Sequence, residues 1–314
     1  MQERTLNMMD NVSVIFMFTL TGFNGTANHR VTLFALTLLC YGVIWLANMT
    51  IIVTICMDKS LHEPMYIFLC NLCINGLYGT TGFYPKLLSD LLSSTHVISY
   101  SGCLLQGFVV HSSVCADVTI LALMAFDRYV ALCQPLTYNS VMTKGRICVF
   151  LSIAWLVPIY LMLQGTIATS LARVCGSHIP RIYCINYFVN RLACTASLAS
   201  AVIPGFNYTI YVLHFFSIVW SYIHLIKECI ISSENRSKFM QTCLPHLFCL
   251  TILFVSMFFD LLYIRFGNNR ISHHVGNFMS IEFLIIPPIF NPLIYGLKLT
   301  QIRKKITQFF IRKK

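Results

Sequence analysis

An acid and a base stand side by side, as Asp127 and Arg128, at the end of a long apolar segment. Because a bare charge is costly in hydrocarbon, such a pair either reaches water at the membrane surface or serves a function. It is therefore a plain helix boundary, or a switch that faces a cytoplasmic partner. Asp117 precedes Arg128 by about 16 Å of helix, which places its carboxyl near the middle of a bilayer. A carboxyl at that depth needs polar neighbours or a proton.

The composition defines the class of protein in which these charges lie. The chain has 314 residues, of which 57% are hydrophobic and 11% are charged, whereas soluble domains average about 25% charged residues. We therefore predict an all-α, polytopic membrane protein without a separate soluble domain. The net charge of +11 does not indicate nucleic acid, because the basic residues gather in loops and in the tail. Anionic membrane lipid is the expected partner of that tail.

Seven apolar segments are long enough to cross about 30 Å of hydrocarbon. They are residues 31–57, 64–85, 103–133, 147–168, 200–226, 239–263 and 272–297. The chain is thus predicted to be a single domain with an extracellular N-terminus (1–30), a seven-helix bundle (31–297) and a cytoplasmic tail (298–314). In the tail, Ile302, Ile306, Phe309 and Phe310 recur at helical spacing among basic residues, which predicts an amphipathic helix on the inner leaflet. We expect no cleaved signal peptide before the first span.

Three features favour an N-terminus outside the cell. Fourteen of the 22 Lys and Arg residues then fall on the inner side, as the positive-inside rule requires. Asn11 and Asn24 each begin an Asn-X-Ser/Thr glycosylation signal, which is modified only on the lumenal side. The outer regions also hold four of the 14 cysteines: Cys103, Cys175, Cys184 and Cys194. An even number in an oxidising compartment indicates bridges, but the spacing leaves three pairings open.

Five motifs in order carry a resemblance to a known family. They are Leu61-His-Glu-Pro-Met-Tyr66, Met124-Ala-Phe-Asp-Arg-Tyr-Val-Ala-Leu-Cys133, Ser221-Tyr222, Lys238-Phe-Met-Gln-Thr-Cys-Leu-Pro-His246 and Pro287-Pro-Ile-Phe-Asn-Pro-Leu-Ile-Tyr295. Over nearly its whole length the chain resembles the rhodopsin-like (class A) G protein-coupled receptors, and specifically the olfactory (odorant) receptors. The resemblance implies disulfide bonds from Cys103 to Cys184 and from Cys175 to Cys194.

The resemblance also implies a switch at the inner face, in which Asp127 holds Arg128 until activation frees it to meet a G protein. Adjacent helical residues face apart, so we expect a splayed pair and a modest restraint. A proline kink in the last span would let a tyrosine change packing partners, although prolines are also tolerated in membrane helices without such a role. The implied switch residues are Asp127, Arg128, Tyr129, Tyr222, Asn291, Pro292 and Tyr295.

By family position, the ligand pocket lies between the outer halves of the third, fifth, sixth and seventh spans. Its lining is mainly apolar with a few polar groups, as is usual for small-molecule sites. The implied ligand-binding residues are His111, Val114, Cys115, Phe206, Asn207, Tyr211, Phe254, Met257, Phe258, Leu261 and Ile281. Plain helix packing competes with each assignment. His111 and Cys115 share a helical face, but two ligands do not make a metal site, and we expect no metal.

Acidic residues near the outer ends have two interpretations. Asp260 and Glu282 can contact a cationic odorant, or they can pair with Arg265 or Arg270.

Asp117 is expected to belong to a polar network with Asn48, Asn75 and Asn291. Most rhodopsin-like receptors place a sodium-binding Asp in the second span, where this chain has Gly76. We therefore doubt a standard sodium site and expect a replacement network that is protonated or binds a cation. The alternative is a neutral, hydrogen-bonded acid.

The resemblance implies an odorant receptor in the plasma membrane of olfactory sensory neurons. It would bind a small odorant and activate a stimulatory heterotrimeric G protein that raises cAMP, without enzyme activity, cofactor or nucleic-acid partner. The alternative is a small transporter with Asp117 as a proton relay. The internal repeats and broken helix pairs typical of transporters are not evident in the sequence.

Overall fold

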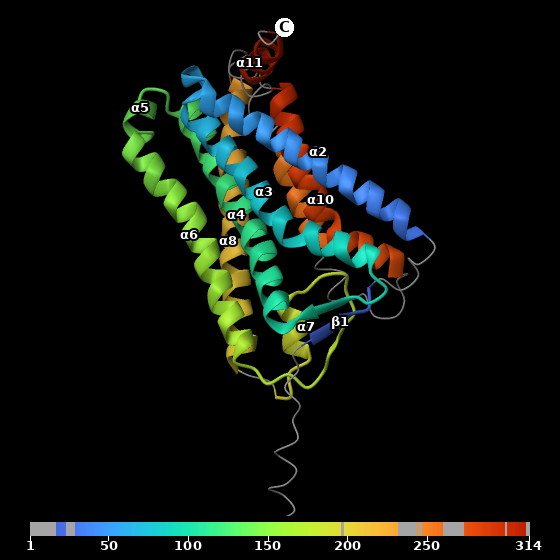
Figure 1. The fold of residues 1–314 in the computed structure, drawn as a ribbon. Coiled ribbons are helices and arrows are strands. Elements are labelled where there is room, and N and C mark those ends of the chain that lie inside the picture. The colour runs from blue at the N-terminus through green and yellow to red at the C-terminus, as the bar shows by residue number, and fades with distance from the viewer. Residues whose placement is uncertain are drawn as a thin grey trace, which may run out of the picture.

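The computed structural model describes residues 17–22, 29–195, 198–231, 244, 247–259, 273–298 and 300–311. Long helices form a bundle, with short strands gathered at one end and helix α11 at the other (Figure 1). We call these the sheet end and the tail end. The helices lie at the positions of the predicted spans: α2 (Arg30–Met57), α3 (Pro64–Leu92), α4 (Tyr100–Cys133), α6 (Lys144–Ser170), α8 (Leu198–Ile231), the helix Leu247–Phe259 and α10 (His273–Lys298).

Helices α2, α4 and α6 are long and apolar enough to cross a membrane, by length and composition. A fourth span is present if Ile281–Gly296 and Gln301–Gln308, which meet at a bend of 87°, are counted together. The count of seven spans stays a prediction.

Local sequence signals explain several helix boundaries. Pro64 occupies the first turn of α3, where its missing N–H costs no helical hydrogen bond. The side chain of Ser99 accepts from the Gly102 N–H at the start of α4, and Thr143 accepts from the Arg146 N–H at the start of α6. Both are favourable N-caps. Such caps set where the helices emerge from the bundle.

Helix α4 is the centre of the bundle, because it packs against α3, α6 and α8. Buried side chains on this helix run from Cys103 near its start to Val130 near its end. They join two apolar clusters, one at the tail end around Leu121 and Tyr295, and one at the sheet end around Phe83 and Tyr183. One helix therefore connects both cores.

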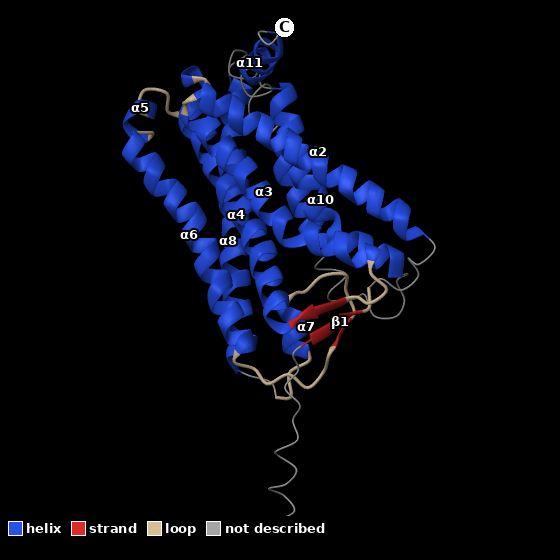
Figure 2. Ribbon diagram, in the orientation of Figure 1, coloured by secondary structure: helices blue, strands red, loops and turns tan. Residues whose placement is uncertain are grey.

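A three-stranded sheet closes the sheet end, and the sequence did not predict it. Strand β1 (Met17–Leu20) lies between β2 (Val97–Ser99), which is antiparallel, and β3 (His178–Ile179), which is parallel. Figure 2 shows these strands below the helices. Phe18 and Leu20 of β1 are buried in the apolar cluster at the sheet end. Met17–Leu20, which precede the first helix, are thus part of the folded protein.

Gly22, just after β1, approaches the chain at Arg181 closely. A Cβ atom on Gly22 would lie 2.5 Å from the carbonyl carbon of Arg181, which is backbone and has little freedom to move. Gly22→Ala should therefore displace β1 and lower cell-surface expression several-fold, measured by labelling an N-terminal tag on live cells. Gly42→Ala is the matched control, because a Cβ there meets nothing within 4 Å. Equal expression of the two variants would contradict the tight fit.

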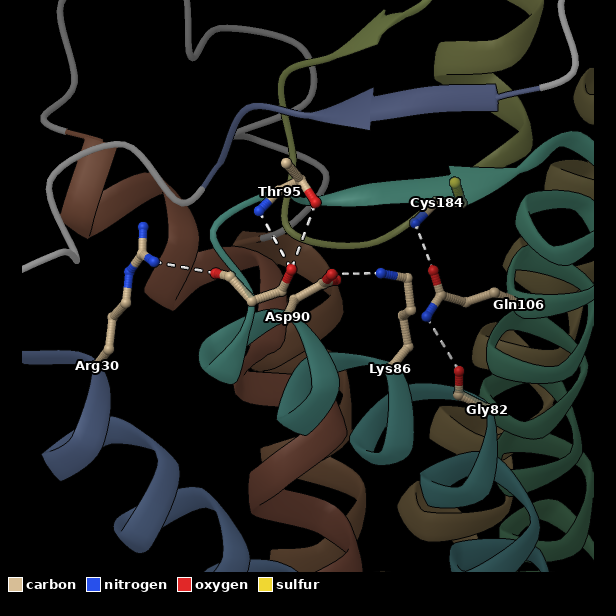
Figure 3. Close-up of polar contacts among 8 residues, drawn as sticks. Arg30, Gly82, Lys86, Asp90, Thr95, Gln106 and Cys184 are labelled. Atoms are coloured by element: carbon tan, nitrogen blue, oxygen red, sulfur yellow. Dashed lines mark hydrogen bonds and ion pairs between the residues drawn. The ribbon is translucent and has the colours of Figure 1, made fainter.

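A hydrogen-bonded loop connects the sheet end to α3 and α4. Gln106 of α4 accepts from the Cys184 N–H at 2.9 Å and donates to the Gly82 carbonyl of α3 at 3.1 Å (Figure 3). Lys86 and Asp90 form an ion pair on the last turns of α3, and Arg30 donates to the Ser93 carbonyl. These contacts continue α3 beyond the predicted end of its span at residue 85.

Helix α11 (Thr300–Ile311) is joined to the turn η2 (Lys59–Leu61) and its cap. Lys305 Nζ lies 2.6 Å from Asp58 Oδ2, and this contact, with hydrogen bonds from Ser60, lowers the pKa of Asp58. Ile302 is fully buried against the protein. The apolar face of α11 was expected to lie on the membrane, but at Ile302 it packs on the bundle. The side chains of Phe309 and Phe310 lie outside the described residues.

Candidate functional site

A polar cluster at the tail end, distinct from the apolar one, is built around Asp127, whose side chain is fully buried. Its Oδ2 atom accepts from Nε of Arg128 at 2.8 Å and also from Nη2 of Arg128. Its Oδ1 atom accepts from the hydroxyl of Tyr138 at 2.9 Å. The expectation of a splayed pair is therefore wrong: the long Arg128 side chain folds back onto its neighbour, where burial strengthens the ion pair.

Tyr138 is a member of this cluster that the sequence interpretation missed. It begins the short helix α5 (Tyr138–Val141) that follows α4, and 11 residues separate it from Asp127. Burial, together with the nearby Asp127 carboxylate, raises the pKa of Tyr138, so its hydroxyl keeps the proton that it donates. The available signal was a tyrosine close to the end of a span that ends in charges.

The other implied switch residues lie near this cluster or in α10. Tyr295 is fully buried and belongs to the same apolar cluster as Cys249, Tyr222 and Cys73. The ring of Tyr129 lies 6.5 Å from that of His224 in α8. Asn291 and Pro292 are buried in α10, which continues as a helix through its three prolines.

Asn75, Asp117 and Asn48 of the expected polar network make two separate connections between helices. Asn75 donates to Asp117 Oδ1 and to the Ser113 carbonyl, each at 2.8 Å, and so joins α3 to α4. Asn48 donates to the Pro288 carbonyl at 2.9 Å and so joins α2 to α10. A Cβ on Gly76 would lie 3.5 Å from Asn48 Oδ1. Asp117 therefore has a protein donor.

On α4, the implied pocket residues occupy one helical face at the sheet end. His111, Val114 and Cys115 follow Gly107 at spacings of four, seven and eight residues, which place all four on one side of a helix. Val114 and Cys115 are buried. His111 donates from Nδ1 to the Gly107 carbonyl at 2.9 Å. This face is the best-defined wall of the predicted pocket.

The remaining implied pocket residues divide into three groups. Met257 packs against both apolar clusters, Phe254 against the tail-end cluster and Ile281 against the sheet-end cluster. Phe206 and Phe258 are 58% and 57% exposed, which does not fit an enclosed site. Leu261 and the side chain of Tyr211 are not among the parts of the chain that the structure describes.

Asn207, which was predicted to contact ligand, forms hydrogen bonds with α6 instead. Its Oδ1 accepts from Gln164 at 3.0 Å, and its Nδ2 donates to the Leu161 carbonyl at 2.9 Å. These bonds join α8 to α6 and use both ends of the amide. We therefore assign Asn207 to helix packing rather than to ligand contact.

A cavity of about 320 Å³ lies between α6 and α8 and includes none of the implied ligand residues. Its lining is Gln164, Ile167, Ala168, Leu171, Ala172, Ala199 and Ile203. Within the part of the chain that the structure describes, no group of three or more His, Cys, Asp or Glu side chains is placed to hold a metal ion.

The cysteines of the sheet end form two bonds. Cys103 is bonded to Cys184, with 5.2 Å between Cα atoms, and Cys175 to Cys194, with 5.0 Å. These are the pairs that the resemblance implies. Asn11, Asn24, Asp260, Arg265 and Arg270 lie outside the described residues, and Glu282 is buried in α10.

Comparison with known proteins agrees with the resemblance. A family model described as "Olfactory receptor" matches residues 37–313. The chain is 32% identical over 307 residues to olfactory receptor 4Q2 of Homo sapiens, with 96% of each chain covered. It is 33% identical over 286 residues to olfactory receptor 1D2 of Gorilla gorilla gorilla, with 90% of each covered. The chain therefore belongs to the olfactory receptor family, and is a multi-pass plasma-membrane receptor rather than an enzyme.

Proposed function

We propose that this receptor binds a small odorant at the sheet end of the bundle and activates a stimulatory G protein, which raises cAMP, at the tail end. The observation that carries the proposal is the placement of two sites on α4. One end of this helix holds the buried Asp127 that binds Arg128 and Tyr138, and the other holds the face of His111, Val114 and Cys115.

The mechanism is a population shift between two arrangements of the bundle. A ligand that binds the α4 face better in one arrangement favours that arrangement throughout, because α4 packs along its length against α3, α6 and α8. The inner half of the sixth span then moves outward, and Arg128 leaves Asp127 to meet the G protein. The ligand supplies only differential binding energy.

The proposed pocket is narrower than the sequence suggested. It comprises His111, Val114, Cys115, Met257 and Ile281, with Phe254 beneath them, and Tyr211 and Leu261 stay predictions. Phe206 and Phe258 are proposed to face lipid, because both side chains are largely exposed and apolar exposure is normal for a membrane-facing surface.

Orientation and cellular setting complete the proposal. We place the sheet end outside the cell and the tail end in the cytoplasm, with seven spans forming one domain. Asn11 and Asn24 are then available for glycosylation. The basic residues of α11 meet anionic lipid of the inner leaflet, and the cell is an olfactory sensory neuron.

Arg128→Ala tests the switch. Removing the guanidinium should abolish odorant-evoked cAMP, because no other group on α4 presents that charge at this position to a G protein. The measurement is cAMP in cells with surface expression matched by live-cell labelling. Arg146→Ala is the control, since the exposed side chain of Arg146 donates to the Ser140 carbonyl of α5. An intact response from Arg128→Ala would refute the assignment.

A transporter is the second candidate, because Asp117 lies buried in the middle of α4 and forms a hydrogen bond with Asn75 of α3. A proton relay needs such a group. Purified receptor in proteoliposomes decides the matter: solute accumulation without G protein would favour transport.

A further inference from the structure

The roof of the proposed pocket presents a buried hydrogen-bond acceptor. Asn186 begins the short helix α7 (Asn186–Arg191), two residues after Cys184. A Cβ atom on Gly107 would lie 3.1 Å from Asn186 Oδ1 and 3.5 Å from the Cys184 carbonyl oxygen. Gly107 belongs to the same face of α4 as His111, Val114 and Cys115. Asn186 Oδ1 therefore lies directly above that face, one helical turn beyond His111.

The orientation of the Asn186 amide follows from its neighbours. The distance from Asn186 Nδ2 to the hydroxyl oxygen of Thr166 is 3.0 Å. That hydroxyl already donates its own proton to the Met162 carbonyl at 2.9 Å. The atom of Asn186 that faces Thr166 must therefore be the donor, Nδ2. The opposite atom is Oδ1, which is an acceptor.

This acceptor is buried, and it has no hydrogen-bond partner among the described residues. Buried polar atoms are nearly always paired, because leaving one unpaired costs its desolvation energy. The surrounding backbone is held in place by the disulfide bond of Cys184 and by the Cys184 N–H donated to Gln106 (Figure 3). A rigid, unpaired acceptor over the pocket suits a donor that arrives with the ligand.

His111 is the second polar residue of this wall. His111 uses its Nδ1 proton on the Gly107 carbonyl, so in the neutral ring Nε2 is also an acceptor. We propose that Asn186 Oδ1 is a specificity-determining contact, and that the receptor favours odorants carrying an O–H or N–H donor, such as alcohols and phenols, over ethers of the same size. This inference rests on the pocket in the proposed function.

The test compares alcohols and phenols with ethers of equal heavy-atom count. Each compound is titrated against purified receptor, with thermal stabilisation as the measure of binding. Wild-type receptor should bind the alcohol or phenol of each pair at least about tenfold more tightly than the ether. This is the effect of one well-formed hydrogen bond. Asn186→Leu should reduce that ratio to near one, mainly by weakening donor binding.

Two further variants keep the inference falsifiable. Asn190→Leu is the matched control: its Oδ1 is also buried without a partner among the described residues, but it is not among the nearest atoms to the Gly107 position, so the ratio should stay at the wild-type value. Thr166→Val leaves Asn186 in place while removing the group that orients its amide. It should lower the ratio even if Asn186→Leu does not fold.

Binding and signalling are measured separately, so the two proposals can fail independently. A donor preference lost in Asn186→Leu supports the inference even if cAMP does not rise, in which case the proposed G-protein coupling fails alone. Equal binding of alcohols and ethers by wild-type receptor, an unchanged ratio in Asn186→Leu or Thr166→Val, or binding of no donor in the panel would each overturn the inference.

Discussion

A receptor carrying both Cys103→Ser and Cys184→Ser should be almost absent from the cell surface. The bond between these residues closes a sequence separation of 81, and the chain-entropy relation gives about 4.5 kcal/mol for a loop of that length. Both residues are fully buried in the sheet-end core, and the bond also fixes the Cys184 backbone that Gln106 holds. Native stability is only about 5 to 15 kcal/mol, so the loss is severe.

The matched control is the double variant Cys175→Ser with Cys194→Ser. That bond spans a separation of 19, for which the same relation gives about 3 kcal/mol, and both of its residues are exposed. Live-cell labelling and thermal unfolding of purified receptor should rank the control well above the Cys103 and Cys184 variant. The reverse ranking would show that the buried bond is not the one that holds the sheet end.

Tyr138→Phe should raise ligand-independent cAMP several-fold. The substitution removes the hydroxyl that donates to Asp127, and a hydrogen bond to a charged group is worth about 1.5 to 3 kcal/mol. Asp127 then holds Arg128 in a less complete site, and the resting arrangement loses stability relative to the active one. Each 1.4 kcal/mol changes that equilibrium about tenfold, so even part of the loss is measurable as basal cAMP.

The control for Tyr138→Phe is Ser140→Ala, two residues further on in the same short helix α5. Ser140 donates its hydroxyl to the Thr137 carbonyl in an exposed turn, so its loss should leave basal cAMP unchanged. Basal activity of Tyr138→Phe no higher than that of Ser140→Ala, at equal surface expression, would show that Tyr138 does not restrain the switch.

Much of the bundle could be predicted from the sequence, because helix position in a membrane protein depends on apolar length. The helix α2, Arg30–Met57, lies almost where residues 31–57 were expected. The sheet could not be predicted, since β1 has only four residues and its partners are far away in the chain. No local periodicity reveals such long-range pairing.

The residues of the candidate site could be predicted from the sequence better than the orientation of their side chains and the contacts that they make. The sequence placed Asp127 beside Arg128, but whether the side chains meet depends on the torsions of Arg128 and on Tyr138, which come from tertiary packing. Asn207 was assigned to the pocket by position alone, whereas its amide is used by α6. Asn186 was not singled out, because its importance depends on Gly107 and Thr166, which approach it only in the folded chain.

The sheet that closes the bundle also sets an order for biosynthesis. Strand β1 is made before the first helix, yet Thr21 and its partner Ile179 are 158 residues apart. At about 5 to 20 residues per second, β1 waits on the order of 8 to 30 s for β3 to be translated. A nascent chain that stops before β3 can pair β1 with β2 but leaves the other edge of β1 unpaired. The sheet can thus be completed only after α2, α3, α4 and α6 have been made, and its completion marks a receptor that has passed that stage of synthesis.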